Sequence, residues 1–96
     1  MLHLIFQSPL ETATLARIGE NDAVLFLENA VLSLLKQGSY ASHLTALQTK
    51  NQLFVLIADI ETRGISPDEL IEGIQIIDYS AWVALTLQQR PIQSWF

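Results

Sequence analysis

Residues 53–65, LFVLIADIETRGI, decide how the rest of the chain is interpreted. The stretch opens with five apolar residues in a row, a run typical of a strand that is buried on both faces. Asp59 is a suitable N-cap, Arg63 is a favourable cation near a helix end, and Gly64 supplies a left-handed stop. The stretch therefore predicts a strand followed by a short helix, and open α/β sheets place ligands in the loop between two such elements.

Three other apolar runs predict further strands. They span residues 2–6, 23–27 and 74–77, and we expect the last two, like the run at 53, to be buried on both faces. Strands alternate with helix signals along the whole chain. This pattern predicts an α/β fold with a small, open, mostly parallel sheet, right-handed crossovers and helices on both sides. We expect residues 1–96 to form one domain.

The helix signals between the strands are local capping patterns. The predicted helices are residues 10–18 behind a Ser8-Pro9-x-Glu11 capping box, 30–36 behind Asn29, 59–63 behind Asp59, a single turn behind Ser66-Pro67-Asp68-Glu69, and 81–89 behind Asp78 or Ser80. Residues 39–51 are polar and predict only a weak helix or a loop. The apolar tail, residues 92–96, is expected to form a short edge strand or to dock on another chain.

The composition excludes several classes of function. The chain has no cysteine, so it can form no disulfide, no thiolate metal site and no persulfide of its own. Its net charge is −5 and its five basic residues are scattered, which argues against tight nucleic-acid binding by this chain alone. No apolar run is long enough to span a membrane, and residues 1–9 do not resemble a signal peptide. A cytoplasmic protein is expected.

Motifs for cofactors and metals are missing from the sequence. It contains neither GxGxxG nor GxxxxGK[ST], so no nucleotide cofactor is expected from a glycine-rich loop. The two histidines, His3 and His43, lie 40 residues apart without partners at metal-ligand spacing, which makes a metal site a poor prediction. His3 lies in a predicted strand. A hydrogen-bonded histidine at the edge of the core is a better interpretation there than a catalytic base.

Polar residues follow the predicted strands and form the candidate site. Asp59 and Arg63 follow the strand at 53, and Glu28 and Asn29 occupy the matching position after the strand at 23. These loops either face one crevice at the carboxyl ends of the strands or serve only as helix ends. A further pair, Trp95 and Phe96, ends the sequence. Terminal aromatic residues either fold back on the domain or anchor a partner.

Taken in order, these segments resemble the TusB/DsrH family of small sulfur-relay subunits, and within it the TusB branch. The resemblance covers nearly the whole chain except residues 36–51. The matching segments are Met1-Leu2-His3 with Ser8-Pro9, AVLFLENAVL at 23–32, the strand at 53 with Thr62-Arg63-Gly64-Ile65, IIDYSAWVALT at 76–86, and Trp95. Glu28, Asn29 and Ala30 stand where the family usually has Gln, Asp and Gly, and Trp82 replaces a Phe.

The resemblance implies a flavodoxin-like, DsrE-like three-layer sandwich and a role in thiolating the wobble uridine of tRNA. It implies TusC-like and TusD-like sister subunits in a heterohexamer, with tRNA contacted only indirectly. The sulfur-carrying cysteine would belong to the TusD-like subunit, in the region equivalent to residues 53–63. This chain would then be a non-catalytic subunit, and self-association is expected when it is isolated. The alternative is a free-standing α/β domain that binds a small ligand or nucleotide at the loops of Glu28, Asp59 and Asp78.

Overall fold

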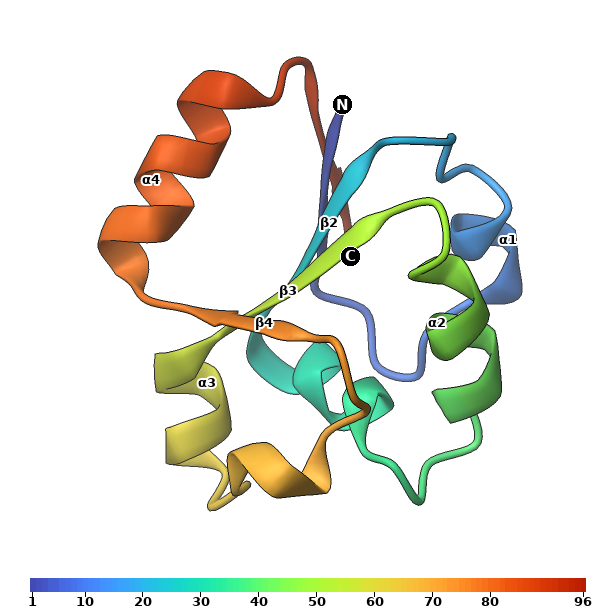
Figure 1. Ribbon diagram of the computed structural model, residues 1–96, viewed down its shortest axis with the longest axis vertical. Helices are drawn as coiled ribbons and strands as arrows, with labels where there is room; N and C mark the ends of the chain where they lie inside the picture. Colours follow the sequence, from blue (N-terminus) through green and yellow to red (C-terminus); the bar gives the residue numbers. More distant parts are fainter.

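The computed structural model describes residues 1–96 as a five-stranded parallel sheet with helices on both faces (Figure 1). The order of the strands in the sheet is β4-β3-β2-β1-β5. The elements in chain order are β1 (Leu2–Ile5), α1 (Thr12–Leu15), β2 (Ala23–Phe26), the 3-10 helix η1 (Glu28–Leu34), α2 (Ala41–Leu47), β3 (Gln52–Leu56), α3 (Ile57–Thr62), the 3-10 helix η2 (Pro67–Glu69), β4 (Gln75–Ile77), α4 (Tyr79–Gln88) and β5 (Ile92–Trp95).

The order of the strands explains why the two faces are covered unequally. The chain steps from β1 to β4 in one direction and then returns across the whole sheet to place β5 beside β1. Right-handed crossovers put the connections of the outward steps on one face and that of the return step on the other. As a result α4 alone covers one face, while the other helices pack on the opposite side (Figure 1).

The core is correspondingly divided by the sheet. One cluster holds fourteen buried residues, among them Phe26, Val55 and Ile60, and lies between the sheet and α1, η1, α2 and α3. The other holds eight, among them Leu25, Phe54 and Leu85, and lies under α4. Successive side chains of a strand point to opposite faces of the sheet, so each central strand contributes residues to both clusters. For this reason these strands appear in the sequence as continuous apolar runs.

The predicted α/β fold and its parallel sheet are confirmed, with one error in the strands. β2 and the apolar part of β3 are buried on both faces, as expected. β4 is not: Gln75 is exposed, and Ile76 and Ile77 are half-buried, because β4 pairs only with β3 and forms an edge of the sheet. The tail forms β5, the opposite edge strand, which pairs with β1.

The helix predicted at 10–18 is much shorter in the structure. α1 covers only Thr12–Leu15, and Ser8 forms no capping box, since Glu11 precedes the helix in an extended conformation. The Gln7 side chain replaces Ser8: its Oε1 accepts hydrogen bonds from the backbone N–H of Glu11 at 3.3 Å and from Thr14 Oγ1 at 2.9 Å. A side chain outside the capping pattern therefore organises this turn.

Several other local signals are confirmed. Glu69 accepts a hydrogen bond from the Ser66 backbone N–H at 3.2 Å, the reciprocal bond expected of the second capping box. Asp78 caps α4 through a 2.9 Å bond from the Ala81 N–H. Gly64 adopts a φ of +68°, the left-handed conformation that favours glycine. Residues 39–51, for which the sequence predicts only a weak helix or a loop, contain the regular helix α2.

Candidate functional site

The loops after β2 and β3 meet at the carboxyl edge of the sheet, as the parallel arrangement requires. They bring together Glu28, Asn29, Asp59 and Arg63, which we call the carboxyl-edge cluster. The Asp59 carboxylate reaches across from α3, where its Oδ2 accepts a hydrogen bond from the Glu28 backbone N–H at 2.7 Å. Glu28 itself has a φ of 52°, a left-handed conformation that is uncommon for a residue with a side chain.

Arg63 makes the other hydrogen bonds within the cluster. Its Nε and Nη2 both donate to Asn29 Oδ1, at 3.0 and 2.9 Å, and its Nη1 donates to the Asp59 backbone oxygen at 3.0 Å. The same Nη1 lies 3.8 Å from Asp59 Oδ1. The guanidinium therefore clamps the start of η1 to α3, one planar group binding both elements.

These contacts correct the roles predicted for two side chains. Asn29 and Asp59 were expected to be N-caps, yet the N-cap positions of η1 and α3 are held by Leu27 and Leu56, whose side chains make no capping hydrogen bond. Both predictions are wrong because the N-cap of η1 lies two residues earlier, and that of α3 three residues earlier, than the local pattern indicates. The two side chains are free to bond across the loops instead.

The cluster offers little chemistry of its own. The positions directly after β3 are Ile57 and Ala58, so no thiol, hydroxyl or imidazole stands at the start of α3. The Asp59 carboxylate accepts from the Glu28 N–H, and the Arg63 guanidinium bonds Asn29 Oδ1 and the Asp59 backbone oxygen. No group of three or more His, Cys, Asp or Glu side chains is placed to hold a metal ion. The arrangement ties two loops together and presents an exposed polar surface.

Trp95 and Phe96 lie away from this cluster, on the β1–β5 side of the sheet. The Trp95 side chain packs against the larger core cluster, and its Nε1 donates to His3 Nδ1 at 3.0 Å. Phe96 is exposed and stacks on the Phe6 ring, with centroids 4.9 Å apart. Asp78, at the end of β4, is engaged as the α4 cap. The predicted site residues thus divide between two places.

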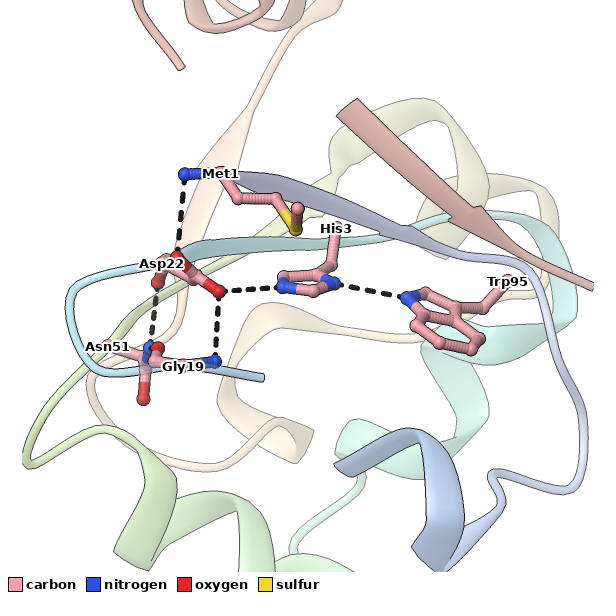
Figure 2. A network of polar contacts seen from close by, with 6 residues as sticks. All are labelled: Met1, His3, Gly19, Asp22, Asn51 and Trp95. Carbon is pink, nitrogen blue, oxygen red and sulfur yellow. Dashed lines mark hydrogen bonds and ion pairs between the residues drawn. The ribbon is translucent and has the colours of Figure 1, made fainter. Parts of the chain in front are cut away.

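A second polar group, the His3 network, surrounds His3 (Figure 2). The prediction of a hydrogen-bonded histidine at the edge of the core is confirmed, but its partners were not predicted. His3 is buried in β1, and its Nε2 lies 2.8 Å from Oδ2 of Asp22, which precedes β2. Asn51, which precedes β3, donates to the backbone oxygens of Gly19 and Asp22 at 2.6 and 2.9 Å. Both residues directly precede strands, and a polar residue in that position is too common to identify them from the sequence.

The partners of His3 fix the proton on its ring. An indole N–H can only donate, so His3 Nδ1 must be the acceptor of the Trp95 bond, and Nε2 carries the hydrogen that faces Asp22 (Figure 2). Burial works to raise the pKa of the Asp22 carboxyl, but three groups outweigh it. The hydrogen bond from His3, the Gly19 N–H and the amino group of Met1 hold the pKa of Asp22 below its ordinary value. The network joins β1 and β5 to the starts of β2 and β3.

None of the helices is both long and apolar enough to cross a membrane. Two of the cavities lie apart from the carboxyl-edge cluster. One of about 310 Å³ is lined mainly by α2 and the loop that follows it, with His43 and Lys50 on its walls. The other, of about 230 Å³, lies between α4 and β1 and is lined by Leu4, Tyr79, Trp82, Val83 and Thr86.

Comparison with known proteins agrees with the sequence resemblance. Two relatives called Protein TusB are similar over 99% of this chain and 100% of their own length: the one from Yersinia enterocolitica is 31% identical, and the one from Photorhabdus laumondii is 29% identical. A solved structure of a protein of unknown function from Methanobacterium thermoautotrophicum has the same fold, with a TM-score of 0.72, 12% identity and coverage of 97% of this chain and 95% of that one. The family model described as DsrH like protein matches residues 7–92. The chain therefore belongs to the DsrH family.

Proposed function

We propose that this chain is a non-catalytic subunit of a sulfur-relay complex that passes persulfide sulfur toward 2-thiolation of the tRNA wobble uridine. Membership of the DsrH family and full-length similarity to proteins named TusB support the relay. The observation that carries the non-catalytic role is the start of α3, where Ile57 and Ala58 follow the buried strand and no cysteine exists anywhere in the chain. A persulfide requires a cysteine thiolate, which a partner must then supply.

The proposal includes the partners that would complete such a relay. We expect TusC-like and TusD-like sister subunits in a heterohexamer, with the transferring cysteine on the TusD-like subunit. This chain would meet tRNA only through them, because its net charge is −5 and its few basic side chains do not gather into a phosphate-binding surface. A cytoplasmic complex is part of the same proposal.

A gene deletion with complementation tests the role in cells. We expect 2-thiouridine in the affected tRNAs, measured by mass spectrometry of digested tRNA, to fall strongly in the deleted strain. The cysteine-free wild-type chain should restore it. Affinity purification of the tagged chain should recover two further small α/β proteins, one with a cysteine after its third strand. Normal thiolation in the deleted strain would refute the proposal.

Calorimetry separates this function from the competing one. A free-standing domain that binds a nucleotide or flavin at the carboxyl-edge loops should show saturable binding that Asp59→Ala abolishes. We expect no such binding, because the Asp59 carboxylate, Asn29 Oδ1 and the Arg63 guanidinium are already engaged in hydrogen bonds within the carboxyl-edge cluster. His43→Ala, a change at an exposed residue outside those loops, is the matched control.

A further inference from the structure

His3 is a buried histidine whose two ring nitrogens have partners of opposite character (Figure 2). Its Nε2 lies 2.8 Å from Asp22 Oδ2, and an ionised carboxylate only accepts hydrogen bonds. Its Nδ1 lies 3.0 Å from the Trp95 indole nitrogen, which only donates, and Nδ1 has no other hydrogen-bond partner. Both bonds are possible only for the neutral ring, with its single proton on Nε2.

A second proton on His3, taken from solvent, would affect the two bonds in opposite ways. It would add to Nδ1, while Nε2 would keep its hydrogen and donate to Asp22 as one half of an ion pair, which is a stronger bond. At Nδ1 two N–H groups would face each other, and the hydrogen bond with Trp95 would be lost. The ring centroids lie 6.3 Å apart, the planes are inclined by 20° and the bond joins the ring edges. The imidazolium would therefore meet the positive edge of the indole and gain no cation–π attraction.

The bond that a second proton breaks holds a weakly anchored strand. β5 is an edge strand that pairs with β1 alone. Its first two residues are exposed, and Trp95 is its only side chain that packs against a core cluster. Beyond β5, Phe96 adds a surface ring stack on Phe6 and a 3.5 Å bond from Gln7. Segments with so few buried contacts open locally at a small free-energy cost, without unfolding of the domain.

We propose that protonation of His3 releases β5 from the sheet and leaves the rest of the domain folded. The other strands keep their pairs, because Asp22 and the protonated His3 remain bonded at the starts of β2 and β1. Release uncovers the backbone edge of β1, and an unpaired strand edge is a template for pairing with another chain. This release depends on the fold alone and not on the sulfur-relay function.

Few charged groups face His3. The Asp22 carboxylate contacts it, and the Met1 amino group lies behind, 3.4 Å from Asp22 Oδ1. The pKa of Asp22 lies below its ordinary value of 3.8, so this carboxylate stays ionised at about pH 5, where histidines are commonly charged. α1 and β5 carry no charged side chain. Acid therefore favours release, because only the released state holds the extra proton without breaking a hydrogen bond. The other ionisable residues near the starts of these strands are exposed and form no ion pair: Arg17, Glu20 and Lys50.

Hydrogen exchange of single backbone amides tests the release. The Phe6 N–H donates to the Trp95 oxygen at 2.8 Å and reports the β1–β5 side, whereas the Leu27 N–H donates to the Ile5 oxygen at 3.0 Å and reports the β1–β2 side. Between about pH 7 and about pH 5 we expect the protection factor of Phe6 to fall by about tenfold and that of Leu27 by less than about twofold. Protection factors correct for the pH dependence of intrinsic exchange. The imidazole signals of His3 in nuclear magnetic resonance spectra report its protonation in the same samples.

Variants at the two histidines isolate the cause. His3→Gln keeps a donor and an acceptor but cannot be charged, so its Phe6 protection should not depend on pH over this range. His43→Gln is the matched control, because His43 is exposed and is the other histidine of the chain, and it should keep the wild-type pH dependence. Trp95→Phe removes the indole donor and keeps an aromatic ring. It should lower the protection of Phe6 at neutral pH and abolish the pH dependence, and circular dichroism shows whether each variant is folded.

Four results would each overturn the proposal. They are a His3 ring that remains neutral at the acid end of the range, a Phe6 amide that stays equally protected once His3 is charged, a fall in protection at Leu27 as large as that at Phe6, and a pH dependence that persists in His3→Gln. The third result would mean that the domain opens as a whole.

Discussion

The His3 network and the carboxyl-edge cluster are both polar groups that join neighbouring strands, but they differ in burial. His3 is buried and bonds Asp22 and Trp95, while the carboxyl-edge cluster lies at the surface, where water can replace its bonds. Losing a partner inside the protein leaves a polar atom without any hydrogen bond, and losing one at the surface does not. The comparison teaches that the edge where this fold usually places chemistry contributes little to stability here.

Replacing His3 should have the largest effect on stability. His3→Ala removes a buried ring and leaves both the Trp95 N–H and the Asp22 carboxylate without their partner. We expect the free energy of unfolding to fall by roughly 3 kcal/mol, measured by urea denaturation. His43→Ala, at an exposed histidine, should change it by less than about 0.5 kcal/mol. Equal effects at the two histidines would contradict a structural role for His3.

The two aspartates provide a matched pair of carboxylates. Each accepts a backbone N–H, Asp22 from Gly19 and Asp59 from Glu28. Asp22→Ala should cost about 2 kcal/mol, because it also leaves the Nε2–H of buried His3 without a partner. Asp59→Ala should cost about 1 kcal/mol or less. If chemical denaturation ranked the two in the opposite order, the contrast between the regions would be wrong.

Acid should weaken the His3 network through Asp22. The pKa of Asp22 is lower in the folded chain than its ordinary value of 3.8. Its contribution to stability is therefore fully present above 3.8 and is lost as the pH falls through the lower, folded value. Asp22→Asn should be less stable than the wild type near pH 6, and the difference should shrink below pH 4. Thermal unfolding over a pH series measures this, and a constant difference would count against the assignment.

Arg63 should show the smallest effect on stability. Arg63→Ala removes three exposed or half-buried hydrogen bonds, so we expect a loss of about 1 kcal/mol or less. Arg63→Lys should not restore the clamp, because an ammonium group cannot bond Asn29 and the Asp59 carbonyl with the same planar geometry. Amide hydrogen exchange at Glu28 and Ala30 would detect loosening of the loop that the global free energy misses.

Much of the fold could be predicted from short stretches of sequence. The runs at 23 and 53 predict buried parallel strands because apolar residues on both faces require helices on both faces. Asp78 and the Ser66 box predict helix starts because a cap acts within three residues. The same local prediction was wrong at Ser8, because the Gln7 side chain accepts the hydrogen bond from the Glu11 N–H. It was also wrong at Asn29 and Asp59, whose side chains bond residues of the other loop.

The candidate site was predictable in its position and not in its contacts. Parallel strands end at one edge, so a shared crevice for Glu28, Asn29, Asp59 and Arg63 was one of the two interpretations, the other being that they serve only as helix ends. That Arg63 would bond Asn29, 34 residues away, has no local signal. The His3 network is more remote still, since Trp95 and His3 are 92 residues apart.

By itself the sequence determined the alternation of strands and helices, the absence of a thiol and the uncharged character of α4. Each of these depends on residue type or on neighbours a few positions apart. The tertiary structure alone decided that β4 and β5 are the edges, that α4 covers one face unaided, and that His3 meets Asp22 and Trp95. These features depend on which strands pair, and strand pairing is chosen by burial over the whole sheet.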